Sequence, residues 1–418
     1  MFQAVGTGAV RKENNQKNAP RHRSVHLKID VPLLVVSITL GIIGLLMVYS
    51  ASWDYSFQLF GSSTQIFQRQ VLWLALGVVV AAILVFFDYR IYRKLAVPFM
   101  IFSIALLVLV LVLSDVRNNA VRTLLGGSIQ PSELAKLVMI IYLAVWLFSK
   151  REQLSDVNFG LIPLAGILGV VGGLIFVQPD LSAVITLFAM GGIMFFLAGG
   201  DLKQIGFLLL LALLFGWVIV ALNSTGSERV SSYLAGLRDP FDASYHVRRS
   251  LEAFVKGGWF GAGIGNSETK LTGLPVPPTD SIFAVIGEET GVFGATVMVV
   301  LYTVILWRGL GIARRAPDGL GTLLAAGLSI WLVMEAMVNM AVMVGLLPFA
   351  GNALPLISAG GSNLVVTCMA IGILLNISRL TVKTREEEEK SFGEMVNLRR
   401  WDRRQRVSRS RRSRRSEG

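Results

Sequence analysis

Cysteine, histidine and charged residues are all scarce in this sequence of 418 residues. It contains one cysteine, Cys368, and three histidines, His22, His26 and His246, which lack any metal-ligand spacing. A disulfide within the chain and a cysteine-bound metal are therefore excluded, and we interpret the histidines as surface residues. Only 16% of the residues are charged, well below the roughly 25% of soluble domains, and 53% are hydrophobic. This composition indicates a chain that resides in a lipid bilayer.

The net charge of +12 is concentrated at the two ends of the chain. Residues 1–30 carry six Lys or Arg and two acidic residues, residues 379–418 carry fourteen and seven, and the remainder carries nineteen and eighteen. Basic segments that flank membrane helices bind the anionic cytoplasmic leaflet, so we interpret both ends as cytoplasmic tails and not as nucleic-acid-binding segments. The sequence thus predicts a membrane domain over residues 31–378.

Repeated apolar runs of about 17 to 25 residues, each able to cross a bilayer as an α-helix, fill this domain. They predict an all-α integral membrane protein with about ten transmembrane helices. The first run is too long for a typical signal-peptide core, so we expect it to remain uncleaved. The predicted spans are residues 31–51, 71–87, 95–114, 132–149, 160–177, 181–198, 205–223, 281–307, 320–344 and 356–377.

Basic residues in the short connections predict the orientation of the chain. They are Arg90, Arg93, Lys94, Lys150, Arg151, Lys203, Arg308, Arg314 and Arg315, and all fall on the side of the two tails. The positive-inside rule makes this side cytoplasmic. The opposite side receives residues 115–131 and one large extracytoplasmic loop, residues 224–280.

The large loop is basic despite its predicted external position. Its basic residues are Arg229, Arg238, Arg248, Arg249, Lys256 and Lys270. Two interpretations stay open: these residues bind an anionic ligand, or they form a solvated surface. Residues 245–256 place apolar side chains on one helical face, which is typical of a helix at the membrane interface. The glycines of GGWFGAGIGNS (257–267) lack the strand–helix context of a nucleotide-binding motif and indicate flexible backbone near a ligand or the membrane.

Ionisable residues within membrane spans are costly and are therefore candidates for function. Glu133 and Lys136 stand three residues apart and can pair on one helical face, or they can handle substrate directly. Asp180 can cap a helix or line a cavity, and we favour the structural role. Asp280 opens the eighth span at the outer boundary, where a carboxylate can meet both a lipid tail and its polar headgroup. Thr279 or Asp280 can equally serve as a plain helix N-cap.

Several segments together resemble the SEDS family of proteins, named for shape, elongation, division and sporulation. The segments are MVYSAS (47–52), QPSELAK (130–136), QPD (178–180), SLEAFVKGGWFGAGIGNSETK (250–270), TDSIFAVIGEETG (279–291) and LPLISAGGSNL (354–364). They occur in order over nearly the whole predicted membrane domain, so the resemblance is specific. It implies ten spans and a peptidoglycan glycosyltransferase that acts on lipid II outside the bacterial cytoplasmic membrane.

The resemblance also implies partners and a cellular site. It implies a class B penicillin-binding protein that supplies transpeptidation, together with other divisome proteins. MVYSAS and the charged tails are more similar to the division branch (FtsW type) than to the elongation branch (RodA type). We therefore expect a multi-pass protein of the inner membrane at the division septum.

The resemblance further implies roles for single residues. Asp280 matches the proposed catalytic aspartate, Glu133 and Lys136 match the paired residues of the fourth helix, and Lys270 matches the lysine of the large loop. The chain departs from the family pattern at His246, where glutamine is usual, and it lacks the Arg-Trp expected before QPSE, around residues 121–123. These departures concern acceptor binding more than the reaction.

The predicted reaction uses Asp280 as the general base on a sugar hydroxyl, which displaces undecaprenyl diphosphate from a second lipid-linked sugar. Cationic side chains such as Lys270, Arg248 and Arg249, or a divalent cation (Mg²⁺ or Mn²⁺), are expected to meet the charge of the leaving group. We expect no organic cofactor. Arg229 is a further candidate for binding the anionic substrate.

Two rival functions remain at the level of sequence. A lipid II flippase could use a buried set of Glu133, Lys136 and Glu335, whereas a polymerase needs its key groups at the outer boundary. The candidate groups cluster outside, which favours the enzyme. A non-catalytic scaffold that recruits a division enzyme is the third possibility.

Overall fold

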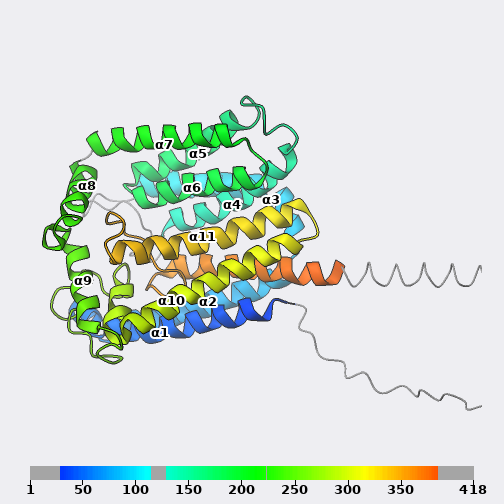
Figure 1. The fold of residues 1–418 in the computed structure, drawn as a ribbon. Coiled ribbons are helices and arrows are strands. Elements are labelled where there is room, and N and C mark those ends of the chain that lie inside the picture. The colour runs from blue at the N-terminus through cyan, green and yellow to red at the C-terminus, as the bar shows by residue number, and fades with distance from the viewer. Residues whose placement is uncertain (1–28, 114–128, 223, 385–418) are drawn as a thin grey trace, which may run out of the picture.

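The computed structural model describes residues 29–113, 129–222 and 224–384 as a helical bundle (Figure 1). The predicted tails lie almost entirely outside these residues, as do residues 121–123. The N-terminal part of the bundle consists of α1 (Val31–Phe60), α2 (Gln65–Phe86), α3 (Tyr92–Leu113), α4 (Pro131–Lys150), α5 (Leu161–Val177), α6 (Leu181–Leu197) and α7 (Leu202–Leu222). The remaining helices are α8 (Ser224–Gly236), α9 (Tyr245–Gly257), α10 (Ile282–Arg315), α11 (Gly319–Met343) and a C-terminal helix (Gly361–Thr384). Two short 3₁₀ turns, η1 (Tyr89–Ile91) and η2 (Pro240–Asp242), complete the described elements.

Within the described residues, helices occupy each of the ten predicted spans. Seven of them are long and apolar enough to cross a membrane, namely α1 to α4, α10, α11 and the C-terminal helix, and the shorter α5, α6 and α7 are also apolar. The all-helical membrane architecture is therefore confirmed. The predicted boundaries were too narrow for α1 and α10, which continue to Phe60 and Arg315.

Burial divides the long helices into a centre and a periphery. Among the seven, α4, α11 and the C-terminal helix are the most buried, whereas α2 is mostly exposed. Exposed apolar side chains on the outer helices are suited to hydrocarbon, where every helix satisfies its own backbone hydrogen bonds. The centre of the bundle is thus the place where polar side chains can be enclosed by protein.

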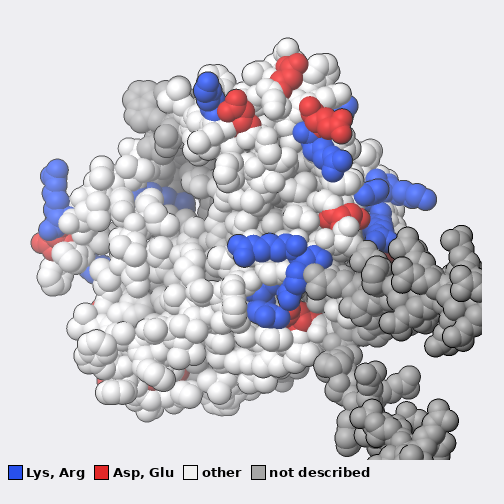
Figure 2. Space-filling view, turned by 45° about the vertical axis from the view of Figure 1, so that its right-hand side comes forward, with Lys and Arg blue, Asp and Glu red and all other residues white. Residues whose placement is uncertain are grey.

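The bundle has two distinct ends. The start of α1 and the end of the C-terminal helix lie at one end, and α8 and α9 lie crosswise at the other (Figure 1). At the first end, Asp318 pairs with Arg90 and Arg93, and Asp30 pairs with Arg308 at 2.6 Å. Lys and Arg side chains gather toward this end beside a wide uncharged surface (Figure 2). The predicted loop 224–280 therefore lies at the end opposite to these arginines.

Candidate functional site

Asp280 lies immediately before α10, at the end of the bundle that carries α8 and α9. Helix α10 begins at Ile282, and its N-cap residue is Ser281, whose side chain makes no capping hydrogen bond. Instead, Ser281 Oγ donates to the carbonyl oxygen of Pro275 at 2.7 Å. The interpretation of Thr279 or Asp280 as the N-cap residue of this helix is therefore wrong. The Asp280 carboxylate is half-buried.

The backbone around Asp280 is held at three consecutive carbonyl groups. The bonds run from Ala359 N–H to Pro278 O (2.7 Å), from Ser358 Oγ to Thr279 O (2.7 Å) and from Asn339 Nδ2 to Asp280 O (2.9 Å). The donors belong to α11 and to the segment that joins α11 to the C-terminal helix, residues 344–360, called the connecting segment below. Residues 278–280, called the Asp280 segment, are thus fixed by a part of the chain that is distant in sequence.

The connecting segment also contacts the Asp280 carboxylate. A Cβ atom built on Gly351 would lie 2.8 Å from Asp280 Oδ2. The carboxylate therefore rests against backbone at a position where a side chain would displace it. Glycine at 351 makes this close approach possible.

Lys270, predicted to bind substrate, lies in a buried ion pair. Its Nζ is 2.8 Å from Glu289 Oε1, 3.0 Å from Ser50 Oγ and 2.8 Å from Gly265 O. The Lys270 side chain is 9% exposed and that of Glu289 is fully buried. These contacts fasten the loop to α10 and α1, and contact with substrate stays a prediction.

Arg248 and Arg249 lie on α9 with different environments. Arg249 pairs with Glu252 and donates to the carbonyl oxygen of Thr272 and, at 2.9 Å, to its Oγ1. Arg248 is exposed, with its guanidinium carbon 5.7 Å from the centre of the Tyr245 ring. Of the two, Arg248 is the one presented at the surface.

Arg229 and His246 meet on the ring of Phe349, two residues before Gly351. The His246 imidazole stacks on Phe349 with ring centres 4.1 Å apart, and the Arg229 guanidinium carbon lies 5.8 Å from the same ring. His246 is therefore half-buried, and its interpretation as a surface residue is wrong. Burial, and then the positive charge of Arg229, lower the pKa of His246, which favours the neutral imidazole.

Glu133 and Lys136 form the predicted pair, at the centre of the bundle. Lys136 Nζ lies 3.0 Å from Glu133 Oε2 and also contacts a carboxylate oxygen of Glu335 on α11. Asn363, near the start of the C-terminal helix, donates to Glu133 Oε2 at 2.9 Å. Three helices are thus joined by one buried polar cluster, which we call the Lys136 cluster. From the sequence, Glu335 was named only as a member of the buried set that a flippase could use.

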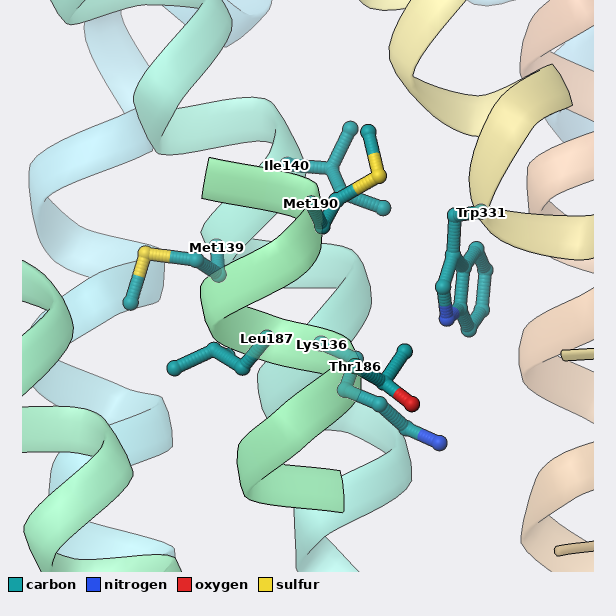
Figure 3. A pocket seen from close by; sticks show the side chains of 7 residues that line it. All are labelled: Lys136, Met139, Ile140, Thr186, Leu187, Met190 and Trp331. Carbon is teal, nitrogen blue, oxygen red and sulfur yellow. The ribbon is translucent and has the colours of Figure 1, made fainter. Parts of the chain in front are cut away.

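A small cavity adjoins Lys136 (Figure 3). Its volume is about 10 Å³, the lower limit of the space that one water molecule needs. The indole of Trp331 faces it from α11, and methionine and aliphatic side chains of α4 and α6 close it. This cavity is too small for a lipid-linked sugar and has room for at most about one water molecule beside Lys136.

Asp180 has the structural role that its sequence context favoured. As the N-cap residue of α6 it accepts a hydrogen bond from Ala183 N–H at 3.2 Å. It also accepts one from Gln130 Nε2 at 2.9 Å, which links α6 to the residue before α4. Its carboxylate is therefore occupied by helix capping and packing.

The glycine-rich part of the loop makes backbone hydrogen bonds to α10, and its flexibility near a ligand or the membrane stays a prediction. Helix α10 breaks at Gly291, where φ is 68°. Across this break, Val292 N–H donates to Gly258 O at 2.9 Å, and Ala262 N–H donates to Glu288 O at 2.9 Å. The glycines permit this close contact between two backbones, since a Cβ on Gly261 would lie 2.2 Å from the carbonyl oxygen of Glu289.

Comparison with known proteins identifies relatives over most of the chain. A family model for FtsW, RodA and SpoVE, described as cell cycle protein, matches residues 31–383. The chain is 38% identical over 356 residues to stage V sporulation protein E of Bacillus subtilis, which covers 84% of this chain and 97% of that protein. It is likewise 38% identical over 371 residues to the probable peptidoglycan glycosyltransferase FtsW of Legionella pneumophila, covering 87% and 94%.

Solved structures match the same region. One belongs to a study of polymerization and crosslinking by a peptidoglycan synthase complex, with a TM-score of 0.70, 28% identity and coverage of 85% of this chain and 99% of that chain. Another is the rod shape determining protein RodA of Thermus thermophilus, with a TM-score of 0.62, 26% identity and coverage of 85% and 98%. The match extends over the described bundle.

Proposed function

The chain belongs to the FtsW/RodA/SpoVE family of cell cycle proteins, and from this membership we propose that it is a peptidoglycan glycosyltransferase that polymerises lipid II into glycan strands. The structural observation that supports this proposal most directly is the Asp280 segment. Three hydrogen bonds to the carbonyl oxygens of residues 278–280 hold the backbone that carries this carboxylate, and the N-cap residue of α10 is Ser281.

Asp280 acts in this proposal as the general base. It takes the proton from the 4-hydroxyl of the N-acetylglucosamine of one lipid-linked sugar, and that oxygen attacks the anomeric carbon of the second. The bond between this carbon and the diphosphate oxygen breaks, the configuration inverts, and undecaprenyl diphosphate leaves with the electron pair. A positioned general base contributes about 10²- to 10⁴-fold to the rate of such a step.

Stabilisation of the leaving diphosphate falls to basic groups of the loop or to a cation. Arg248 is the better placed of the predicted residues, because its guanidinium is exposed on α9, whereas Lys270 and Arg249 already pair with glutamates. Arg229, whose guanidinium lies beside the Phe349 ring, is the second candidate. In the described part of the chain, no three His, Cys, Asp or Glu side chains cluster as a metal site. A bound Mg²⁺ or Mn²⁺ would therefore take most of its ligands from diphosphate oxygens and water, as Mg²⁺ commonly does.

The cellular context is proposed from the relatives. Curated relatives named FtsW and a sporulation protein support a role in division, and the match to a peptidoglycan synthase complex supports a class B penicillin-binding protein as partner. The apolar helices support a multi-pass location in the bacterial inner membrane. We place the protein at the septum on the same grounds.

The test compares wild type and Asp280→Asn in the presence of a cognate class B penicillin-binding protein and lipid II. Asparagine is nearly isosteric but cannot accept the proton, so we expect glycan synthesis to fall at least about 100-fold. The matched control is Asp242→Asn, which changes an exposed carboxylate of η2 at the same end of the bundle and should leave the rate unchanged. Full activity of Asp280→Asn would remove Asp280 from the role of base. If wild type moves lipid II across vesicle membranes but makes no glycan, the flippase interpretation is correct instead.

A further inference from the structure

We propose that Asn339 is a positioning residue for polymerisation, because its buried amide sets the place of the Asp280 carboxylate relative to the connecting segment. The proposal rests on the proposed function, since it assumes that Asp280 is the base. It assigns no contact between Asn339 and substrate.

The amide of Asn339 uses its nitrogen for two carbonyl groups. Nδ2 donates to Asp280 O at 2.9 Å and to Asn352 O at 2.6 Å, and the residue is fully buried. Its Oδ1 is buried without a hydrogen-bond partner. The flipped amide would point this oxygen at two carbonyl oxygens, so the chemistry of the site fixes the orientation of the side chain.

The two acceptors belong to the two segments that define the site. Asp280 O belongs to the segment that carries the carboxylate. Asn352 O belongs to the residue after Gly351, and the backbone of Gly351 lies against Asp280 Oδ2. One amide therefore joins the carboxylate's own backbone to the surface on which the carboxylate rests. A displacement of about 1 Å at a reacting group can cost about 100-fold in rate, so this distance matters for catalysis.

Asn339 is in turn held from inside the bundle. Glu335 lies one turn earlier on α11 and contacts Lys136, so the Lys136 cluster sets the rotation of α11 about its axis. Asn363 of the same cluster fixes the start of the C-terminal helix, where the connecting segment ends. The buried ions thus act on the reaction through Asn339 and the connecting segment, at a distance from substrate.

Asn376 provides a matched control at the other end of the bundle. It is also fully buried, donates through Nδ2 to Val85 O at 2.9 Å and accepts from Tyr89 N–H at 3.1 Å. Asn376→Ala therefore removes an equally buried asparagine that bonds to backbone but lies far from Asp280. Its effects report the general cost of losing such a side chain.

The first measurement is steady-state polymerisation of lipid II by the full-length protein with its partner. For Asn339→Ala we expect kcat to fall at least about 10-fold with KM within about twofold, because the base moves and the binding groups of the loop stay in place. Asn376→Ala should lower the Tm by a similar amount and leave kcat within about twofold. Equal kcat values for the two variants would overturn the proposal.

A double-mutant cycle with Gly351→Ala separates positioning from general loss of stability. The added methyl group presses on Asp280 Oδ2 from the connecting segment, so it disturbs the same carboxylate as Asn339→Ala. We expect the kcat losses of Asn339→Ala and Gly351→Ala to combine to less than their product, whereas those of Asn376→Ala and Gly351→Ala should multiply. Multiplication in both cycles would overturn the proposal.

The controls keep this inference separate from the proposed function. If Asp280→Asn polymerises as wild type does, the proposed function fails. If Asp280→Asn is inactive while Asn339→Ala keeps the kcat of Asn376→Ala, only the positioning role fails. If Asn339→Ala does not accumulate in the membrane, Ser358→Ala takes its place, because it removes the neighbouring hydrogen bond to Thr279 O. The kcat loss of Ser358→Ala combined with Gly351→Ala must then be smaller than the product of the two single losses.

Discussion

At the scale of single residues, two adjacent glutamates of α10 anchor the loop that precedes it. Glu288 accepts hydrogen bonds from the backbone N–H groups of Glu268 and Thr269 at 3.0 and 3.2 Å, and Glu289 pairs with Lys270. Both carboxylates are buried, and each has partners on the loop. Charge buried in this way is stable only when it is paired or hydrogen-bonded, so the loop and α10 depend on each other.

Removal of Lys270 should therefore act first on stability. Lys270→Met leaves Glu289 charged and buried, which typically costs about 3–5 kcal/mol, whereas Lys270→Met combined with Glu289→Gln should regain most of this loss. The measurement is the Tm of each variant in nanodiscs, together with lipid II polymerisation. If Lys270 serves only the ion pair, the double variant recovers both quantities. Recovery of the Tm without activity would show that Lys270 also binds substrate.

The sequence predicted some of these residues and contacts but not others. Asp280 was identified through the family resemblance and its place at a span boundary, and the pairing of Glu133 with Lys136 followed from their spacing. The hydrogen bonds from Asn339 and Ser358 could not be predicted, because they join residues that only tertiary packing brings together. The pairing of Lys270 with Glu289 was missed for the same reason, since Lys270 was considered only as a residue that binds substrate.

At the scale of elements, the break in α10 explains the glycines on both sides of it. Gly291 has a φ of 68° and a ψ of −169°, and the backbone groups it releases bond to residues 258 and 259 of the loop. Apolar periodicity predicted a continuous span here, because GVFGATV fits a helix without interruption. A break satisfied by a neighbouring loop leaves no signal in hydropathy.

Gly291→Ala should accordingly destabilise the protein. The new Cβ would lie 2.5 Å from Gly261 N, and an L-residue at this φ adds strain of about 1–2 kcal/mol, so we expect a loss of at least about 2–3 kcal/mol. Gly311→Ala is the control on the same helix. A Cβ atom at this position would lie 3.5 Å from its nearest neighbour, the end of the Arg315 side chain. This variant should be neutral or stabilising by up to about 1 kcal/mol. Thermal unfolding of both variants decides, and equal Tm values would contradict the structural role of the break.

At the scale of the whole molecule, the two ends differ in chemistry. Arginines paired with Asp30 and Asp318 lie at the end where the described chain begins and finishes, and the loop with α8 and α9 lies at the other. The hydropathy and charge patterns predicted this arrangement well, since both depend on local composition. The hydropathy and charge patterns could not predict the contacts that fix Asp280 at one of these ends, because those contacts depend on tertiary packing.

Cysteine labelling should place the two ends on opposite sides of the membrane. Asp242→Cys and Glu152→Cys each replace an exposed acidic residue, one at each end, and the native Cys368 is buried, so background labelling should be low. A membrane-impermeant maleimide applied to spheroplasts should label residue 242 at once and residue 152 only after permeabilisation. The reverse order would place Asp280 on the cytoplasmic side and exclude its access to external lipid II.

The hydrogen bonds on residues 278–280 also impose an order on biogenesis. Their donors follow Asp280 in the chain, at Asn339, Ser358 and Ala359, so the ribosome must deliver α11 and the connecting segment before the carboxylate is fixed. A nascent chain that has already inserted α10 would still lack these hydrogen bonds, and with them the assembled form of the proposed active site. Translation thus delays wall synthesis by this protein until nearly the whole bundle has entered the membrane.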